Sequence, residues 1–212
     1  MNLQTAPHTG RVAGRPRPTT ERGRRTRAAI VAAAGRLMLE RGVAATSLDD
    51  VLSACGAGKS QLYHYFGSKQ ELVAAVIDHQ LQRVMANQPR LGDLRTWEDF
   101  DGWATDLLAM HVGPGGPLAC PLGSLAGELD GDSALHVELD AALRTWESYL
   151  ARGLTRLQER GELRGDADPA RLAATAMAAL QGGLMLAHLR NDITPLRDAL
   201  AMAMDHLRAN HA

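Results

Sequence analysis

The chain has 212 residues, of which 45% are hydrophobic and 4% aromatic, and its formal net charge is −1. This length suffices for one sizeable hydrophobic core or two small ones. No apolar run approaches the roughly 18 residues of a membrane span, and the N-terminus lacks an apolar signal region. We therefore expect a cytoplasmic protein without a membrane partner.

Helix-favouring residues recur along the whole chain. Alanine, leucine, arginine and glutamate are frequent, and no stretch shows the alternation of β-branched and aromatic residues that is typical of strands. The two cysteines, Cys55 and Cys120, lie far apart, which predicts neither a disulfide framework nor a zinc site. The sequence thus indicates an all-α protein.

Positive charge is concentrated at the N-terminus. Residues 1–27 hold seven arginines against one glutamate, a net charge of +6, so the remainder carries about −7. Glycines and prolines predict that residues 1–23 form a flexible basic arm. Such an arm on an acidic body is typical of nucleic-acid binding, because cations near phosphates release counterions. A disordered tail that only aids solubility is the alternative.

The first two helices are predicted from apolar spacing and capping residues. Residues 24–41 carry an apolar stripe at helical spacing, and Gly42 supplies a stop. The next helix begins at Thr46 or Ser47, whose hydroxyl can cap it, and ends at Cys55.

The third helix covers about residues 59–65. A capping box, in which Ser68 is followed three residues later by Glu71, then opens a fourth helix that fades near Asn87. Residues 87–96 are predicted to be a connector.

The C-terminal part is predicted to hold five more helices. Asp168 and Thr194 are each followed by proline, which predicts that they are the N-caps of two helices. The predicted helices cover residues 97–111, 118–129, 133–160, 169–190 and 194–208.

Two short helices separated by a turn at Gly56 have the spacing of a helix-turn-helix. Leu62 and Phe66 of the second helix are expected to pack inward. The same helix presents polar and aromatic side chains suited to a DNA groove. These are Lys59, Ser60, Gln61, Tyr63, His64 and Tyr65. Filling of a small core is the alternative role for the two tyrosines, which we expect to flank the helix and reach phosphates.

A set of residues at fixed spacing in and around these two helices resembles the N-terminal domain of TetR-family transcriptional regulators. The set is Thr46-Ser47-Leu48, Val51, Ala54, Gly56, Leu62-Tyr63-His64-Tyr65-Phe66, Ser68-Lys69 and Glu71-Leu72. The resemblance covers about residues 24–75. It implies a homodimer that binds double-stranded DNA and is released when a small molecule binds the C-terminal domain.

By position, the resemblance implies that Lys59, Ser60 and Gln61 face bases. It also implies that Thr46, Tyr63, Tyr65 and Lys69 hold phosphates. Gly58 departs from the family, which often has serine or threonine at this N-cap. The departure removes one hydroxyl that could contact a phosphate.

Several C-terminal side chains could line an apolar pocket with a few polar groups, although core packing explains each of them individually as well. They are Trp103, Met110, His111, Cys120, Trp146, Tyr149 and Met177. The segment 119–129 resembles a stretch of TetR subgroups that sense drugs, other hydrophobic compounds or electrophiles. Cys120 is therefore either a sensor thiol or a small buried hydrophobe.

The last two predicted helices are rich in alanine, glycine and methionine on several sides. Such helices can pack against the same pair of a second subunit in an isologous four-helix bundle. Two helix-turn-helix domains about one DNA turn apart would then require a near-palindromic site.

These observations predict an N-terminal three-helix helix-turn-helix domain over residues 24–70. A fourth helix joins it to a C-terminal ligand-binding and dimerisation domain over 71–212. The predicted function is a repressor released from its operator by a hydrophobic or electrophilic ligand. No catalytic group, cofactor or metal is expected, since no nucleophile and base, phosphate loop or histidine spacing fits one. A protein-binding adaptor and a helical enzyme are the alternatives.

Overall fold

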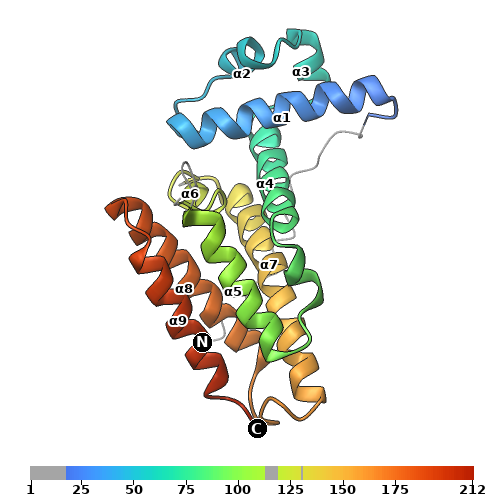
Figure 1. Ribbon diagram of the computed structural model, residues 1–212. Helices are drawn as coiled ribbons and strands as arrows, with labels where there is room; N and C mark the ends of the chain where they lie inside the picture. Colours follow the sequence, from blue (N-terminus) through green and yellow to red (C-terminus); the bar gives the residue numbers. More distant parts are fainter. Residues whose placement is uncertain (1–17, 113–118, 130) are drawn as a thin grey trace, which may run out of the picture. The chain divides into compact units, whose positions relative to one another are not determined.

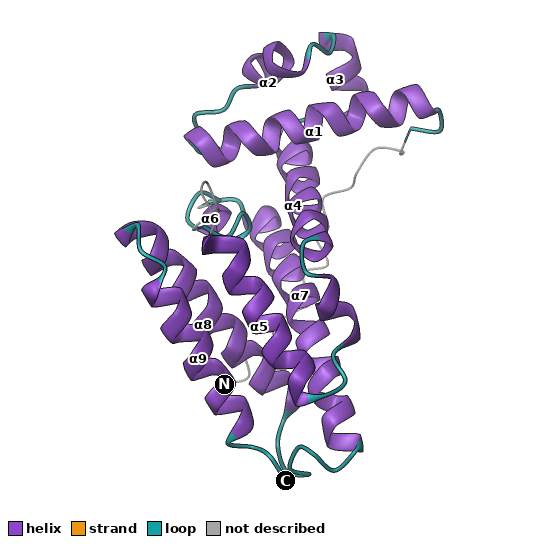
Figure 2. Ribbon diagram, viewed as in Figure 1, coloured by secondary structure: helices purple, strands orange, loops and turns teal. Residues whose placement is uncertain are grey.

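The computed structural model describes residues 18–112, 119–129 and 131–212. Within these ranges the secondary structure is helical, with one isolated β-bridge between Leu163 and His211 and no strand (Figures 1 and 2). The predicted all-α class is confirmed. Arg11, Arg15 and Arg17 of the predicted arm lie outside the described residues.

The described chain divides into two compact units. One holds the residues up to His79 together with Leu125–Ala141, and the other holds Gln80–Ser124 and Ala142–Ala212. The change of unit therefore falls inside the fourth helix. The functional division predicted at residue 70 stays a prediction.

The first unit is built on helix α1 (Glu21–Arg41), which contacts both α2 (Leu48–Cys55) and α3 (Lys59–Tyr65). Helix α4 (Lys69–Ala86) begins in this unit, and α7 (Ser133–Glu159) begins in its second segment. The buried side chains come from all three N-terminal helices and from the start of α4. They include Ile30, Leu37, Val51, Leu62, Phe66, Leu72 and Val76.

Helix boundaries in the first unit follow the capping residues. The hydroxyl of Thr20 accepts a hydrogen bond from Gly23 N at 3.1 Å, so α1 begins three residues earlier than predicted. Helix α3 has the predicted bounds, and α2 ends at Cys55 as predicted but begins at Leu48, directly after its N-cap Ser47. At α4, Ser68 Oγ accepts from Glu71 N at 3.1 Å, while the Glu71 carboxylate accepts from Gly67 N.

The second unit contains the 3₁₀ turn η1 (Pro89–Asp93), α5 (Trp97–Val112), the rest of α7, α8 (Pro169–Arg190) and α9 (Thr194–Arg208). Helices α8 and α9 pack side by side, and α5 also contacts α9 (Figure 1). A Cβ at Gly183 would come 2.8 Å from Cβ of Ala199. The close approach of α8 and α9 therefore depends on the missing side chain at this glycine.

In the C-terminal part the predicted bounds of α6 are wrong, whereas α9 has its predicted bounds but not its predicted N-cap. Helix α6 covers only Gly123–Ala126 instead of 118–129, because Pro121 lacks an N–H and glycines disfavour helix on both sides of Ser124–Ala126. Helix α9 is not capped by Thr194. Instead, Asp192 Oδ1 accepts hydrogen bonds from both the backbone N and the hydroxyl of Thr194.

Helix α8 is long and apolar enough, by length and composition, to cross a membrane. This qualifies the expectation that the chain has no such segment. However, 44% of its apolar window is buried within the protein, and α8 packs along α9. A core helix of a soluble protein has these same properties, so the observation is weak support for a membrane span.

Candidate functional site

Local hydrogen bonds fix both ends of α2, the helix that precedes the turn to α3. Ser47 and Asp50 form a capping box: Ser47 Oγ accepts from Asp50 N at 3.1 Å, and Asp50 Oδ2 accepts from Ser47 N at 3.0 Å. At the other end of α2, Gly56 has a φ of +68° and its N–H donates to Leu52 O. This left-handed conformation is the one that favours glycine.

The Asp50 carboxylate is kept ionised by its cap. The hydrogen bond from the Ser47 hydroxyl, followed by that from the Ser47 backbone, lowers the pKa of Asp50 below its ordinary value. Since the folded pKa is the lower one, this stabilisation is present at neutral pH and is lost as the pH falls through the folded pKa.

Helix α3 separates its apolar and polar side chains. Leu62 is fully buried and Phe66, just after the helix, is 2% exposed, as predicted. Lys59, Ser60, Tyr63 and His64 are exposed, whereas Gln61 and Tyr65 are half-buried. The structure therefore presents most of the predicted DNA-binding side chains of α3 at the surface.

Gly58 has no side chain that could cap α3, and the side chain of Gln61 takes part in the cap instead. Gly58 has an ordinary extended conformation, with φ −74° and ψ 149°, and its N–H donates to Gln61 Oε1 at 3.0 Å. The side-chain carbonyl of Gln61 thus takes part in capping, while its amide N–H groups remain for other partners. Residue type and spacing alone do not indicate this double role.

The two predicted phosphate-holding residues outside α3 differ in accessibility. Lys69 is half-buried and its Nζ donates to Ala44 O at 3.3 Å. Thr46 is 1% exposed, and its hydroxyl donates to Gly42 O at 2.8 Å. A phosphate contact by Thr46 would require its side chain to leave this position, so Thr46 is not part of the surface proposed below.

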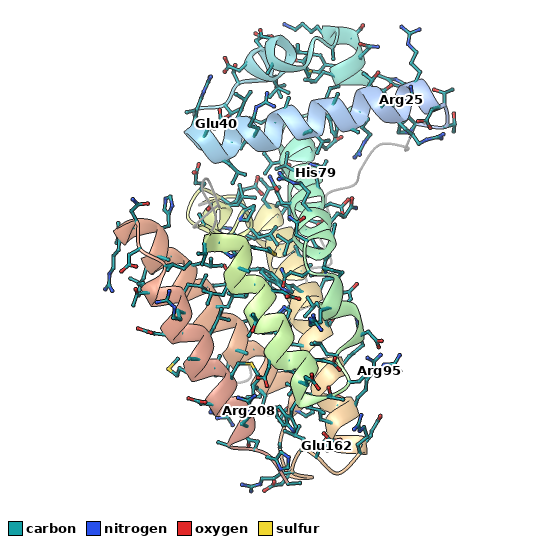
Figure 3. The ribbon with its side chains drawn as sticks, viewed as in Figure 1. Arg25, Glu40, His79, Arg95, Glu162 and Arg208 are labelled. Carbon is teal, nitrogen blue, oxygen red and sulfur yellow. The ribbon has the colours of Figure 1, made fainter. Side chains whose placement is uncertain are left out.

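Some arginines of the basic N-terminal segment, residues 1–27, belong to the first turns of α1. Arg24 and Arg25 both pair with Glu21, at 2.7 and 3.0 Å, and both are well exposed. Figure 3 shows Arg25 projecting from the N-terminal end of this helix. The helical start places these positive charges on a rigid element.

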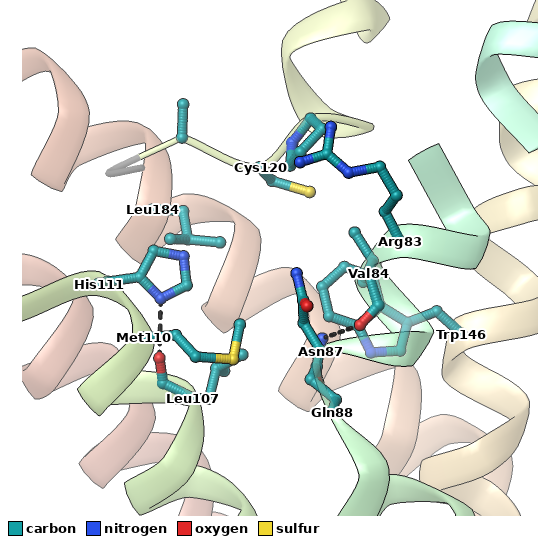
Figure 4. Close-up of a pocket in the computed structure, with 12 residues that line it drawn as sticks. Arg83, Val84, Asn87, Gln88, Leu107, Met110, His111, Cys120, Trp146 and Leu184 are labelled. Carbon is teal, nitrogen blue, oxygen red and sulfur yellow. Dashed lines mark hydrogen bonds between the residues drawn. The ribbon is translucent and has the colours of Figure 1, made fainter. Parts of the chain in front are cut away.

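A second candidate site is a cavity of about 80 Å³ in the C-terminal unit (Figure 4). Four predicted ligand-binding residues line it: Met110, His111, Cys120 and Trp146. The remaining lining residues come mainly from the end of α4 and from α5 and α8. They include Arg83, Val84, Asn87, Gln88, Leu107 and Leu184.

Three predicted ligand-binding residues do not line this cavity. Trp103 is 2% exposed and its Nε1 donates to Gln88 Oε1 at 2.9 Å. Met177 is buried, with its sulfur near Gln181 Nε2 at 3.7 Å, and Tyr149 lies under the guanidinium of Arg152 at 4.2 Å. The α4 contribution was missed because Arg83 to Gln88 look like a fading polar helix end in the sequence.

Comparisons with known proteins decide the family. A family model described as "Bacterial regulatory proteins, tetR family" matches residues 30–76, and one described as "Tetracyclin repressor-like, C-terminal domain" matches residues 100–203. The chain belongs to the TetR family. It is a DNA-binding transcriptional regulator of that family, whose members typically dimerise and bind small-molecule effectors.

Relatives match this TetR-family regulator over most of its length. An HTH-type transcriptional regulator of Mycobacterium tuberculosis is 29% identical over 179 residues, which cover 79% of this chain and 86% of the relative. The structure of a TetR transcriptional regulator from Chloroflexus aurantiacus is 27% identical with a TM-score of 0.73, and covers 91% of this chain and 98% of that one. The reduced form of E. coli NemR, 22% identical, shares the fold with a TM-score of 0.76 over 89% and 97% of the two chains.

Helix α8 of this TetR-family regulator has an exposed face of small and apolar side chains. Met185 is 63% and Leu189 78% exposed, and one to three turns before Met185 lie the half-buried Gly182 and the exposed Ala178 and Ala174. A Cβ at Gly182 would meet no atom within 4 Å. This face is therefore open to close approach by another helix.

Gly42, in the turn before α2, is at a position where a side chain should destabilise the protein. Its φ is +89°, and a Cβ there would come 2.5 Å from Oε2 of Glu128, which also accepts from Val43 N at 2.5 Å. We expect Gly42→Ala to destabilise the protein by about 1–3 kcal/mol in chemical denaturation. Gly92→Ala is the matched control, because its Cβ would meet nothing within 4 Å. Equal stability of the two variants would contradict this explanation.

Proposed function

We propose that this TetR-family regulator is a repressor that binds a near-palindromic operator as a homodimer and is released when a small ligand enters the C-terminal cavity. The observation that carries the proposal is the exposed polar face of α3 on a helix-turn-helix that matches the family. This function belongs in the cytoplasm, where the operator DNA lies.

In this proposal α3 enters the major groove. Lys59, Ser60 and the free amide of Gln61 face base edges, where donors and acceptors can distinguish base pairs. Tyr63, Tyr65 and Lys69 hold phosphates and set the register of the helix. His64 shares the exposed face with Tyr63, and the His64 and Tyr65 rings meet edge to face at 5.1 Å.

The homodimer is proposed to form through α8 and α9. The exposed apolar face of α8 provides surface that a second copy would remove from water. An isologous pairing of this face would also explain why α8 is apolar on the side opposite its buried side chains.

The effector is proposed to be a small hydrophobic or electrophilic molecule that binds in the cavity. Cys120 lies in the cavity wall, is 6% exposed and accepts a hydrogen bond from Gln181 Nε2 at 3.5 Å. Its thiol is thus within reach of a molecule that enters the cavity.

Salt-titrated gel shifts on the DNA upstream of the protein's own gene test the DNA-binding surface. Lys69→Ala should weaken binding about equally for all sequences and reduce the salt slope by about 1. Tyr63→Phe should also act equally across sequences. Gln61→Ala should instead change sequence preference, by roughly 1–3 kcal/mol per lost base contact.

Because Gln61→Ala also removes the cap of α3, the double variant Gly58→Ser/Gln61→Ala serves as its control. A serine fits at position 58, since its Cβ would meet Gln61 Oε1 at an ordinary 3.6 Å and the local φ is negative. The serine hydroxyl would restore a cap without restoring a base contact. If wild-type affinity for upstream DNA equals that for random DNA at physiological salt, the proposed operator binding is wrong.

A further inference from the structure

The indole N–H of Trp146 is a buried hydrogen-bond donor without a partner among the described residues. Trp146 is 2% exposed, its Nε1 is inaccessible to solvent, and its side chain lines the C-terminal cavity. Gln80 Nε2 and Trp97 Nε1 are also buried and unpaired, but neither residue lines this cavity. Trp146 therefore combines a free donor with a place for an acceptor.

The nearby amide of Gln88 is bonded to other partners and makes no hydrogen bond with Trp146. Gln88 Oε1 already accepts from Trp103 Nε1 at 2.9 Å, and Gln88 Nε2 donates to Val84 O at 3.3 Å. Figure 4 shows Gln88 and Trp146 on the same side of the cavity, with the bond from Gln88 to Val84 drawn. Since buried donors in native proteins are nearly always paired, a water or a ligand in the cavity would supply the acceptor that Trp146 lacks.

The charge of the cavity favours an anionic acceptor. Its lining contains Arg83 and no aspartate or glutamate. The described residues give Arg83 one hydrogen bond, a long one of 3.5 Å to Gln80 Oε1, and Figure 4 shows its guanidinium turned toward Cys120. The wall between these polar groups is apolar, formed by side chains such as Leu107, Met110 and Leu184.

We infer that the effector is a small carboxylate with a short apolar body, whose carboxylate oxygen accepts the Trp146 N–H in the positive potential of Arg83. This inference rests on the proposed function, because it names the chemical class of the effector. A single water needs a cavity of roughly 10–15 Å³, so a cavity of about 80 Å³ suits a molecule of only a few non-hydrogen atoms. Butyrate has this size and chemistry.

Indole N–H resonances in a ¹H–¹⁵N spectrum of the DNA-free protein give a direct test. The chain has three tryptophans, so three indole signals are expected. Butyrate should shift the Trp146 signal downfield in a saturable way and leave the Trp103 signal unmoved, because Trp103 already donates to Gln88. Butyramide should bind about tenfold more weakly, and butylammonium should not bind.

Calorimetry on variants completes the test. Trp146→Phe removes the donor and keeps a ring, and should weaken butyrate binding about tenfold. Trp97→Phe is the matched control, since it removes an equally unpaired indole outside the cavity, and it should bind butyrate normally. Arg83→Gln, at an exposed position that folding tolerates, should also weaken binding.

Each failure has its own meaning. If none of the three probes moves the Trp146 signal, water holds the N–H and the inference is overturned, while operator binding in gel shifts still stands. If butyrate moves the signal and binds through Trp146 but leaves the operator complex intact, the carboxylate site is supported and ligand-induced release fails.

Discussion

Met185→Glu should convert the proposed dimer into a monomer and lower operator affinity roughly 10²–10⁴-fold, the range by which linking two binding modules raises affinity. Met185 is 63% exposed and lies on the apolar face of α8, one turn before Leu189. In an isologous interface the same substitution occurs on both sides, so two carboxylates would be desolvated near each other without counterions. Sedimentation velocity and gel shifts on the same sample measure both effects.

Val137→Glu is the matched control for this charge. Val137 is a similarly exposed apolar residue, at 42%, but it lies on α7 outside the proposed dimer surface. The control should remain a dimer with wild-type affinity. A monomer that keeps its helical circular dichroism would show that Met185→Glu disrupts association rather than folding, whereas a stable dimer would rule out α8 as the interface.

The N-terminal helices were predictable from the sequence because their signals are local. Ser47, Gly56 and Ser68 act on backbone groups a few residues away, so the bounds of α2 and α3 follow directly from them. Burial of Leu62 and Phe66 follows from the same short-range spacing. The start of α1 was missed because Thr20 lies in a segment whose prolines and glycines suggested an arm.

The cavity was only partly predictable because it is assembled from distant segments. Met110, His111, Cys120 and Trp146 stand out in the sequence as uncommon side chains in apolar surroundings. Arg83 and Gln88 do not stand out, because polar residues are ordinary at the end of a helix. Their place in the cavity depends on residues of α5 and α7 that lie far along the chain. The capping bond from Gly58 to Gln61 was missed for another reason, since it replaces a residue type that the family usually supplies.

Phe66→Ala should destabilise the N-terminal unit by about 3–5 kcal/mol, the usual cost of truncating a buried phenylalanine. Phe66 is 2% exposed, and the guanidinium of Arg27 from α1 lies 5.1 Å from its ring centroid. The substitution would leave a void between α1 and α3 and remove a cation–π contact. This loss is a large fraction of the 5–15 kcal/mol that stabilises a typical domain.

Hydrogen exchange of the α1–α3 amides, measured together with operator affinity, checks this expectation. Phe66→Leu keeps most of the buried volume and should cost less than about 1.5 kcal/mol. Tyr63→Ala is the second comparison, because Tyr63 is 43% exposed and its loss should weaken DNA binding while the amides of α1 stay protected. Opposite patterns for these two aromatic residues, three positions apart, would separate the side chain that holds α3 in place from the side chain that meets DNA. Equal exchange in both variants would mean that Phe66 does not anchor α3.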